Sequence, residues 1–270
     1  MKKTGELWRP VILTAFLIFM VVPVIATLLF SVSTRWDRSL WPEGYTLDWW
    51  SAVTGRAAFL LTLKNSFIAS FATMLCLLVL VTPTAYWMKL KVPQAKPIVE
   101  VITTFSFGVP GVVLALALIR FYSKVPLPIV NHPTILVAAC MVLSLPFMYR
   151  PILNALEAID FRVLTEAAQS LGANTWSILS EVIVPNIVSG LISGSLLVFS
   201  TVFSEFTLTN LLVGTRFKTF PIYLVEFTRF DGRQASALAV ISFVVAWVTS
   251  LLIIWATSKV SREATHVVGR

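Results

Sequence analysis

Two glutamates are the residues of this sequence whose positions suggest chemistry. Glu166 opens a Glu-Ala-Ala triplet at 166–168 within a polar loop, and Glu205 lies deep inside an apolar run. Neither has the companions that catalysis requires, because the sequence holds no H-E-x-x-H metal motif, no nucleophile elbow and no phosphate-binding G-x-x-x-x-G-K-S/T loop. His132 and His266 lie far apart, outside the apolar runs. The chemistry indicated is ion pairing and docking, so the sequence predicts a chain that is not an enzyme and binds no metal.

The composition places these groups in a membrane protein. Of the 270 residues, 57% are hydrophobic and only 13% are charged, whereas soluble domains carry about 25% charged residues. The formal net charge of +8 suits basic loops at a lipid surface better than it suits nucleic-acid binding. Cys76 and Cys140 both lie within apolar runs, which argues against a disulfide and against a metal site built on thiolates.

Six apolar stretches are candidates for crossing a bilayer. A spanning helix needs about 20 residues, because each residue adds about 1.5 Å and the hydrocarbon layer is about 30 Å thick. The stretches are Val11–Phe30, Ser66–Met88, Ile98–Ile119, Thr134–Tyr149, Ile187–Leu212 and Ala235–Ala256. The first is too long for a signal peptide and lacks a cleavage site, so we interpret it as a retained helix. The sequence predicts an all-α polytopic membrane protein with six transmembrane helices, forming a single domain over residues 1–270 with a core at about 60–258.

The distribution of basic residues is only weak evidence for the orientation of these helices in the membrane. Summed over inner and outer segments, Lys and Arg are nearly balanced. Lys89, Lys91 and Lys96, however, crowd one short segment beside a span, and short segments weigh most in the positive-inside rule. We therefore expect the N- and C-termini in the cytoplasm.

The segment 150–186 is a loop with helical periodicity. Its apolar stripe recurs at i, i+3, i+4 and i+7 and consists of Leu164, Ala167, Ala168 and Leu171. Asp160 can cap the start of this helix, Gly172 can end it, and Asn174 can cap a following turn. Four acids against two bases in the segment disfavour a lipid-surface helix, which is usually basic. We expect the loop, on the cytoplasmic side, to dock on a protein partner.

The spacing of motifs within this loop is specific. The triplet at 166–168 is followed after three residues by Gly172-Ala173, and later by Pro185. This pattern resembles the EAA loop of the membrane subunits of bacterial type I ABC importers, whereas a bare triplet would be an ordinary surface turn. Further segments resemble the polyamine (spermidine/putrescine) branch of these binding-protein-dependent permeases, namely Asn65–Ala69, Pro83–Tyr86, Val109–Leu114, Ser204–Thr207 and Thr219–Tyr223.

The resemblance implies the membrane-spanning permease subunit of an ATP-driven importer in the bacterial inner membrane. The coupling residues that it implies are Glu166, Ala167, Ala168, Leu171, Gly172 and Ala173. They would sit in a cleft of a separate cytoplasmic ABC ATPase dimer, which holds ATP and Mg, so that this chain itself binds no cofactor. Because the family uses two such loops, the resemblance also implies a second, homologous permease subunit in a heterodimer. A periplasmic or lipid-anchored solute-binding protein would deliver the solute.

The residues expected along the translocation pathway, or at its gate, are Glu205, Pro110 and Gly111. An ionisable side chain within a span is costly and indicates function by default. Pro110 and Gly111 resemble a turn in the family's third helix. A structural carboxylate paired with a neighbouring helix is the alternative for Glu205.

The resemblance favours a polyamine as the solute, with a phosphonate, a phosphorylated small molecule or iron as alternatives. Two other classes of function remain. One is a membrane receptor or assembly subunit whose loop docks a non-ATPase partner. The other is an ion-coupled secondary transporter, whose usual inverted repeats and paired midplane charges are not evident in this sequence.

Overall fold

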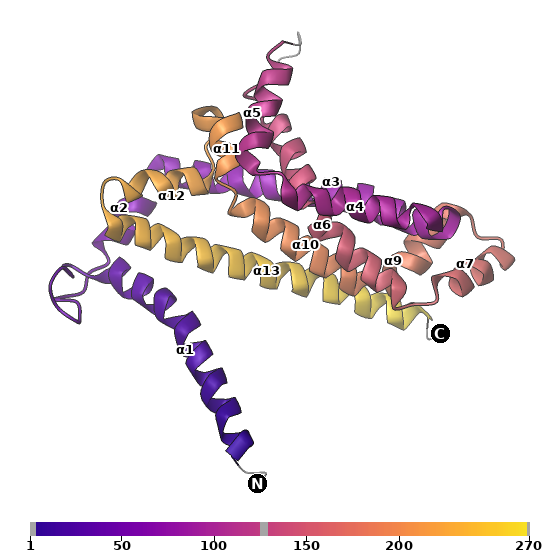
Figure 1. The fold of residues 1–270 in the computed structure, drawn as a ribbon, viewed down its shortest axis with the longest axis horizontal. Coiled ribbons are helices and arrows are strands. Elements are labelled where there is room, and N and C mark those ends of the chain that lie inside the picture. Colours follow the sequence, from indigo (N-terminus) through magenta and orange to yellow (C-terminus); the bar gives the residue numbers. More distant parts are fainter. Residues whose placement is uncertain (1–3, 125–128, 269–270) are drawn as a thin grey trace. The chain divides into compact units, whose positions relative to one another are not determined.

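The computed structural model is built from helices (Figure 1). It describes the backbone of residues 4–124 and 129–268, and the side chains of residues 8–124 and 129–255. The long helices are α1 (Thr4–Val32), α3 (Ala57–Lys91), α6 (Pro133–Glu157), α10 (Val188–Phe203) and α13 (Gly232–Val268). The shorter helices are α2 (Asp48–Thr54), α4 (Lys96–Gly108), α5 (Gly111–Tyr122), α7 (Phe161–Ser170), α8 (Thr175–Ser177), α9 (Val184–Asn186), α11 (Thr207–Leu212) and α12 (Phe220–Thr228). Turns of other helix types are η1 (Pro93–Ala95), η2 (Ile178–Ile183) and η3 (Gly214–Phe217).

The chain divides into two compact units. Unit one comprises Met1–Leu60 and Tyr223–Val245, and unit two comprises Leu61–Ile222 and Ala246–Arg270. Unit two holds both predicted sites, the 150–186 loop and the surroundings of Glu205. The single domain with a core at about 60–258 stays a prediction.

Within the described residues, four helices are long and apolar enough to cross a membrane unbroken. They are Trp8–Val32, Ala57–Lys91, Pro133–Glu157 and Gly232–Trp255. Two further spans exist as bent pairs: Pro93–Gly108 with Gly111–Tyr122, bent by 97°, and Thr175–Asn186 with Val188–Phe203, bent by 79°. Counted with each bent pair as one span, the total is six, and the all-α polytopic fold is confirmed.

Two predicted spans are not continuous helices. The span expected at Ile98–Ile119 breaks because Val109, which precedes a proline, takes an extended conformation (φ −92°, ψ 111°) instead of a helical one. The span expected at Ile187–Leu212 also breaks, since α10 ends at Phe203 and α11 starts only at Thr207. Hydropathy alone cannot detect such breaks, because the residues on both sides remain apolar.

The fourth span is longer than predicted. We expected Thr134–Tyr149, but α6 begins at Pro133 and continues to Glu157. His132 caps its start by accepting a hydrogen bond from the Thr134 N–H, and Pro133 suits the first helical turn, where no N–H is needed. The predicted 150–186 loop therefore starts inside α6, and the helix leads almost directly into α7.

Two glycines let α6 and α10 pack side by side in unit two (Figure 1). A Cβ added at Gly190 would lie 2.5 Å from the Pro151 carbonyl oxygen and 2.5 Å from the Ala155 Cβ. A Cβ added at Gly194 would lie 2.8 Å from the Met148 Sδ. Small residues at this spacing allow membrane helices to approach closely, so backbone here packs directly on backbone.

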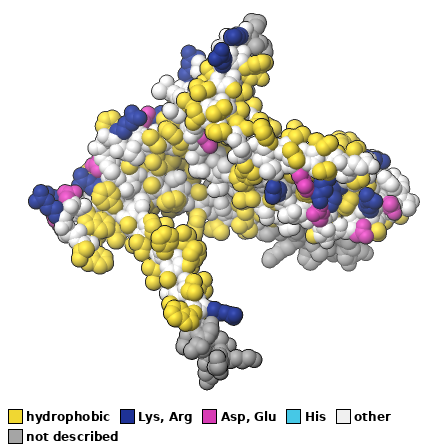
Figure 2. Space-filling model, viewed as in Figure 1, with side chains coloured by type: hydrophobic (Ala, Val, Ile, Leu, Met, Phe, Trp, Pro, Cys, Tyr) yellow, Lys and Arg dark blue, Asp and Glu magenta, His cyan; other side chains and the backbone are white. Residues whose placement is uncertain are grey.

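Helix α1 presents its apolar side chains outward. Residues 8–26 of this helix are all exposed, and Figure 2 shows hydrophobic side chains along it. Such a surface requires lipid or another protein chain around it. The chain ends 1–3 and 269–270 lie outside the described residues, as does the side chain of His266, so the cytoplasmic placement of both termini stays a prediction.

We predict that Gly190→Ala destabilises the permease fold, because the new methyl group overlaps the Pro151 carbonyl and the Ala155 side chain. Overpacking of this kind costs about 1–3 kcal/mol. The measurement is the thermal unfolding midpoint of the purified protein in detergent. Gly108→Ala is the control, because a Cβ there meets nothing within 4 Å. Equal midpoints for the two variants would refute the close α6–α10 contact.

Candidate functional site

The α7 helix of the predicted coupling loop has defined ends. The Asp160 side chain accepts a hydrogen bond from the Val163 N–H (3.4 Å) and caps the start. At the other end Gly172 has φ +83°, and its N–H bonds to the Gln169 carbonyl (2.9 Å) while the Ala173 N–H bonds to the Ala168 carbonyl (3.0 Å). These two bonds form a Schellman motif, which needs a left-handed residue at the position of Gly172. The predicted cap and stop are confirmed.

The turn after α7 is capped as well. The Asn174 Oδ1 accepts hydrogen bonds from the N–H groups of Trp176 and Ser177, each at 3.0 Å. The capped turn leads into α8. Helix, glycine turn and second cap follow one another as the sequence predicts.

The buried and exposed residues of α7 do not match the apolar stripe predicted from the sequence. The buried residues are Phe161 and Thr165, whereas Leu171, expected in the apolar stripe, is 90% exposed. Glu166 and Ala167 are exposed too, and Ala168 is half-buried. The stripe fails because a helix this short is held by its first turns, and its last residue extends beyond the supporting surface. The exposed triplet and Leu171 are therefore free to contact another chain.

A buried hydrogen bond fixes α7 to the end of α3. The Tyr86 hydroxyl lies 2.9 Å from the Thr165 Oγ1, and because the Thr165 hydroxyl already donates to the Phe161 carbonyl (2.6 Å), Tyr86 is the donor. The Tyr86 ring also meets the Phe161 ring edge-on at 6.5 Å. Tyr86 is completely buried. The sequence reading missed this contact, although a tyrosine within a span needs a hydrogen-bond partner for its hydroxyl.

Ion pairs join three helices beside this contact. Glu157, the last residue of α6, lies 3.2 Å from the Lys89 Nζ of α3 and 2.9 Å from the Lys96 Nζ of α4. Lys96 also approaches Glu100 at 3.7 Å. The Lys89 ammonium lies 5.4 Å above the Phe161 ring. Lys89 and Lys96, two of the three lysines used above to orient the helices, therefore also hold α6 and α7 against α3 and α4.

Glu205 lies at the break between α10 and α11, not within a continuous helix. Its carboxylate accepts a hydrogen bond from the Leu208 N–H (2.8 Å) and so satisfies the first turn of α11. Among the described side chains it forms no ion pair. The carboxylate keeps the capacity to accept further hydrogen bonds.

The break at Val109 and Pro110 meets the break between α10 and α11 in unit two. A Cβ added at Gly111 would lie 3.9 Å from the Thr207 Cγ2 and 4.0 Å from the Leu208 Cδ2, so the start of α5 adjoins the start of α11. A cavity of about 200 Å³ lies at this junction and reaches Val109 and Glu205. Pro110 and Gly111 are not among its lining residues. The polar lining besides Glu205 consists of Ser106, Cys140, Ser144 and Thr201, and the aromatic lining of Phe107 and Phe147.

Within the described residues, no three His, Cys, Asp or Glu side chains group closely enough to hold a metal ion. The geometry thus consists of the partly exposed helix α7 and a cavity with one carboxylate. Helix α7 lies outside the candidate spans, whereas the cavity is lined largely by residues of the spans.

Residues 81–262 match the sequence profile of the family described as "Binding-protein-dependent transport system inner membrane component". The chain belongs to this family. The matched segment contains α7, Glu205 and both bent spans. This permease is accordingly a multi-pass protein of the inner membrane.

Several curated relatives align with the permease over most of their length. The "Spermidine/putrescine transport system permease protein PotC" of Escherichia coli (strain K12) is 24% identical over 97% of this chain and 96% of its own. The PotB permease of Haemophilus influenzae is 26% identical over 76% of this chain and 77% of its own. PotB of Salmonella typhimurium (strain LT2) is 25% identical over 96% of each chain.

Solved structures share the fold of the permease. A chain of a bacterial ABC transporter involved in the import of alginate superposes with a TM-score of 0.74, at 17% identity and over 96% of both chains. A chain of the MetNI methionine ABC transporter gives 0.57, at 19% identity over 76% of this chain and 93% of that one. The bent spans are therefore part of an importer fold.

We predict that Tyr86→Phe weakens the attachment of α7. The variant removes a buried hydrogen bond, which contributes about 1 kcal/mol, and leaves the ring in place. The unfolding midpoint of the purified permease should fall, and trypsin should cut after Arg162 sooner. Tyr45→Phe is the control, because Tyr45 is 64% exposed. If both variants behave like the natural protein, the Tyr86–Thr165 contact does not hold the helix.

Proposed function

We propose that this permease belongs to an ATP-driven importer that carries a polyamine across the bacterial inner membrane by alternating access. The observation that carries the proposal is the α7 protrusion, which is rigid, exposed at its tip and attached to the ends of two spans. The family and its polyamine-importing relatives support the same function. They favour neither a receptor docked by a non-ATPase partner nor an ion-coupled transporter.

The tip of the protrusion has the character of a docking surface. Leu171, Val163 and Trp176 are 90%, 58% and 63% exposed, and Glu166 beside them is exposed and free of ion pairs among the described side chains. Exposed apolar side chains next to a charged group mark protein interfaces. We assign this surface to docking in the cleft of a cytoplasmic ABC ATPase. Two copies of the ATPase hold ATP and Mg. The coupling residues are the six that the sequence resemblance implies, at 166–168 and 171–173.

The mechanism follows from how α7 is held. Closure of the two ATPases moves α7, and the movement passes to α3 through Tyr86–Thr165 and to α6 through the three residues that separate the helices. The spans then rotate as rigid bodies and expose the Glu205 cavity to a solute-binding protein, periplasmic or lipid-anchored. Hydrolysis returns the inward-facing state. A second, homologous permease subunit supplies the other half of the pathway in a heterodimer, and this chain binds no cofactor itself.

The cavity chemistry supports a cationic solute over a phosphonate or a phosphorylated molecule. Its lining contains a carboxylate and no Lys or Arg. The rings of Phe107 and Phe147 meet edge-on at 5.3 Å beside it, and aromatic faces attract ammonium groups. We assign Glu205 to the ammonium group of the passing polyamine, with Pro110 and Gly111 forming the break that opens the pathway.

Gly172→Asp should abolish coupling while the spans still insert. The variant forces a Cβ into a conformation with φ +83° and places a charge at the docking tip. We expect the co-purifying ATPase to be lost and spermidine uptake to fall to background at normal membrane levels of the permease. Glu166→Ala should reduce both in the same direction.

Gly214→Asp is a matched control, because Gly214 also has a positive φ (+49°) and open space around it but lies outside the loop. It should retain the ATPase. Normal uptake with Gly172→Asp would show that α7 does not take part in coupling.

Glu205→Gln should raise the KM for spermidine uptake by about tenfold, the effect of losing one charge-assisted contact. The glutamine oxygen can still accept from the Leu208 N–H, so the start of α11 stays capped. Glu43→Gln, at an exposed loop position, is the control. An unchanged KM would return Glu205 to a purely structural role.

The cavity also contains its own reporter. In a Cys76→Ser background, Cys140 is the remaining cysteine and lines the cavity. A cationic thiosulfonate should label it faster than its neutral analogue does, and Glu205→Gln should abolish the difference. Equal rates before the substitution would show that the carboxylate does not attract cations there.

A further inference from the structure

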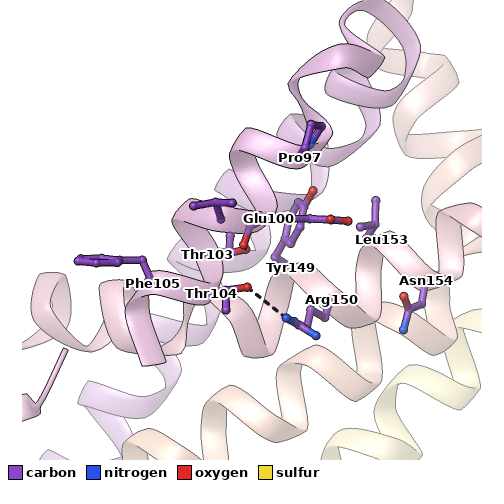
Figure 3. A pocket seen from close by; sticks show the side chains of 10 residues that line it. Pro97, Glu100, Thr103, Thr104, Phe105, Tyr149, Arg150, Leu153 and Asn154 are labelled. Atoms are coloured by element: carbon purple, nitrogen blue, oxygen red, sulfur yellow. Dashed lines mark hydrogen bonds between the residues drawn. The ribbon is translucent and has the colours of Figure 1, made fainter. Parts of the chain in front are cut away.

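A second cavity lies apart from both sites described so far. It is a cleft of about 660 Å³ between α4 and α6 (Figure 3). It shares no lining residue with the Glu205 cavity. Its polar lining consists of Glu100, Thr103, Thr104, Tyr149, Arg150 and Asn154. The cleft adjoins the ion pairs of Lys96, Glu157 and Glu100, so it lies at the end of the spans that carries α7.

Arg150 is the residue in this cleft that requires explanation. It is exposed, and its Nη2 donates to the Thr104 Oγ1 at 3.2 Å (Figure 3). No described carboxylate lies within 4.0 Å of it. Arg150 precedes Glu157 by seven residues, which is about 10 Å of helix. A guanidinium that far inside a span needs a counter-charge.

Glu100 supplies a negative charge elsewhere in the same cleft. Its side chain extends from α4 toward α6 (Figure 3). Its ion pair with Lys96 is long, at 3.7 Å, because Lys96 bonds more closely to Glu157 at 2.9 Å. The Glu100 side chain is 47% exposed and lines the cleft, so its carboxylate can accept further hydrogen bonds. The cleft therefore offers one cation and one anion at separate points.

The rim of the cleft is apolar. Val101 and Phe105, which line the cleft, are 68% and 70% exposed, and their neighbours Ile98 and Ile102 on α4 are 63% and 58% exposed. These side chains belong to the bent pair Pro93–Gly108 with Gly111–Tyr122, and such an exposed apolar face suits the hydrocarbon of the bilayer. Pockets between transmembrane helices that contain basic residues bind lipid headgroups, and Arg is well suited to bind phosphate through paired hydrogen bonds.

We propose that the cleft between α4 and α6 binds the headgroup of a zwitterionic phospholipid. The phosphate lies on Arg150, beside Thr104 and Asn154, and the ammonium group lies on Glu100. The acyl chains lie along the exposed face of α4. The bound lipid thereby neutralises Arg150 and connects α4 to α6 next to the root of α7.

The direct test is native mass spectrometry of the intact transporter, with both permease subunits and the ATPases, after delipidation. Titration with phosphatidylethanolamine should show a lipid whose affinity falls about tenfold or more in Arg150→Gln. Arg120→Gln, an exposed arginine at the end of α5, is the control and should bind as the natural protein does. Equal affinity in Arg150→Gln and the control overturns the proposal.

The ammonium contact is tested separately. Glu100→Gln should weaken phosphatidylethanolamine, yet leave phosphatidylglycerol, which has no ammonium group, unchanged. Equal weakening of both lipids, or of neither, contradicts the assignment of Glu100. Soluble phosphoethanolamine should compete poorly, because it lacks the acyl chains. If it binds as tightly as the lipid, the ligand is a soluble phosphate compound and the lipid proposal is wrong.

A photo-crosslink identifies the occupant even if Arg150→Gln folds poorly. Benzoylphenylalanine in place of Phe105, on the rim of the cleft, should form an adduct with phospholipid in native membranes. An adduct with the second permease subunit instead would mean that protein covers the cleft, and would overturn the proposal. Spermidine uptake and ATPase retention are measured in parallel, so that a failure of the lipid site is distinguished from a failure of the transport function.

Discussion

Within a bilayer, every backbone N–H and C=O must find its partner inside the protein, and two of the breaks in this structure are places where helices cannot provide it. The breaks at Val109 and at 204–206 expose peptide groups at the start of α5 and α11. The start of α5 lies against the start of α11, and the Glu205 carboxylate accepts from the Leu208 N–H. Irregular backbone is tolerated at membrane depth where it lines a cavity, and a cavity is present here. The same requirement that brings the breaks together therefore creates the internal space.

The contacts at the start of α7 attach a polar helix to helices that are embedded in the membrane. Phe161 and Thr165 lie against Tyr86, while Glu157 is held between Lys89 and Lys96. An apolar contact alone would permit sliding, whereas a buried hydroxyl pair fixes the position because an unpaired hydroxyl there is costly. Lys89 serves both parts, since its ammonium pairs with Glu157 and lies above the Phe161 ring. A displacement of α7 would thus reach α3, α4 and α6 together.

The sequence predicted those features that depend on neighbouring residues. The caps at Asp160 and Asn174 and the stop at Gly172 are local hydrogen-bonding patterns, and they were correct. Six apolar stretches and the EAA spacing identified the fold class and the family. The Tyr86–Thr165 contact could not be predicted, because it joins residues 79 positions apart. The breaks and the extension of α6 to Glu157 escaped hydropathy, which measures apolar content and is insensitive to backbone direction. The exposure of the end of α7 was not predicted, because periodicity assigns residues to one face of a helix but does not indicate where the surface beneath that face ends.

The glycine contact between α6 and α10 has a consequence for transport. With no side chain at Gly190 to deform, the two backbones touch, and a shift of α6 cannot be absorbed by rotamer changes. One end of this pair leads through Glu157 to α7, and α10 ends at Phe203, directly before Glu205. The α7 site and the Glu205 cavity therefore lie at opposite ends of the closely packed pair of α6 and α10. In the proposed importer, any free energy that nucleotide binding to the ATPase contributes to reshaping the cavity is matched by an equal effect of cavity occupancy on nucleotide binding.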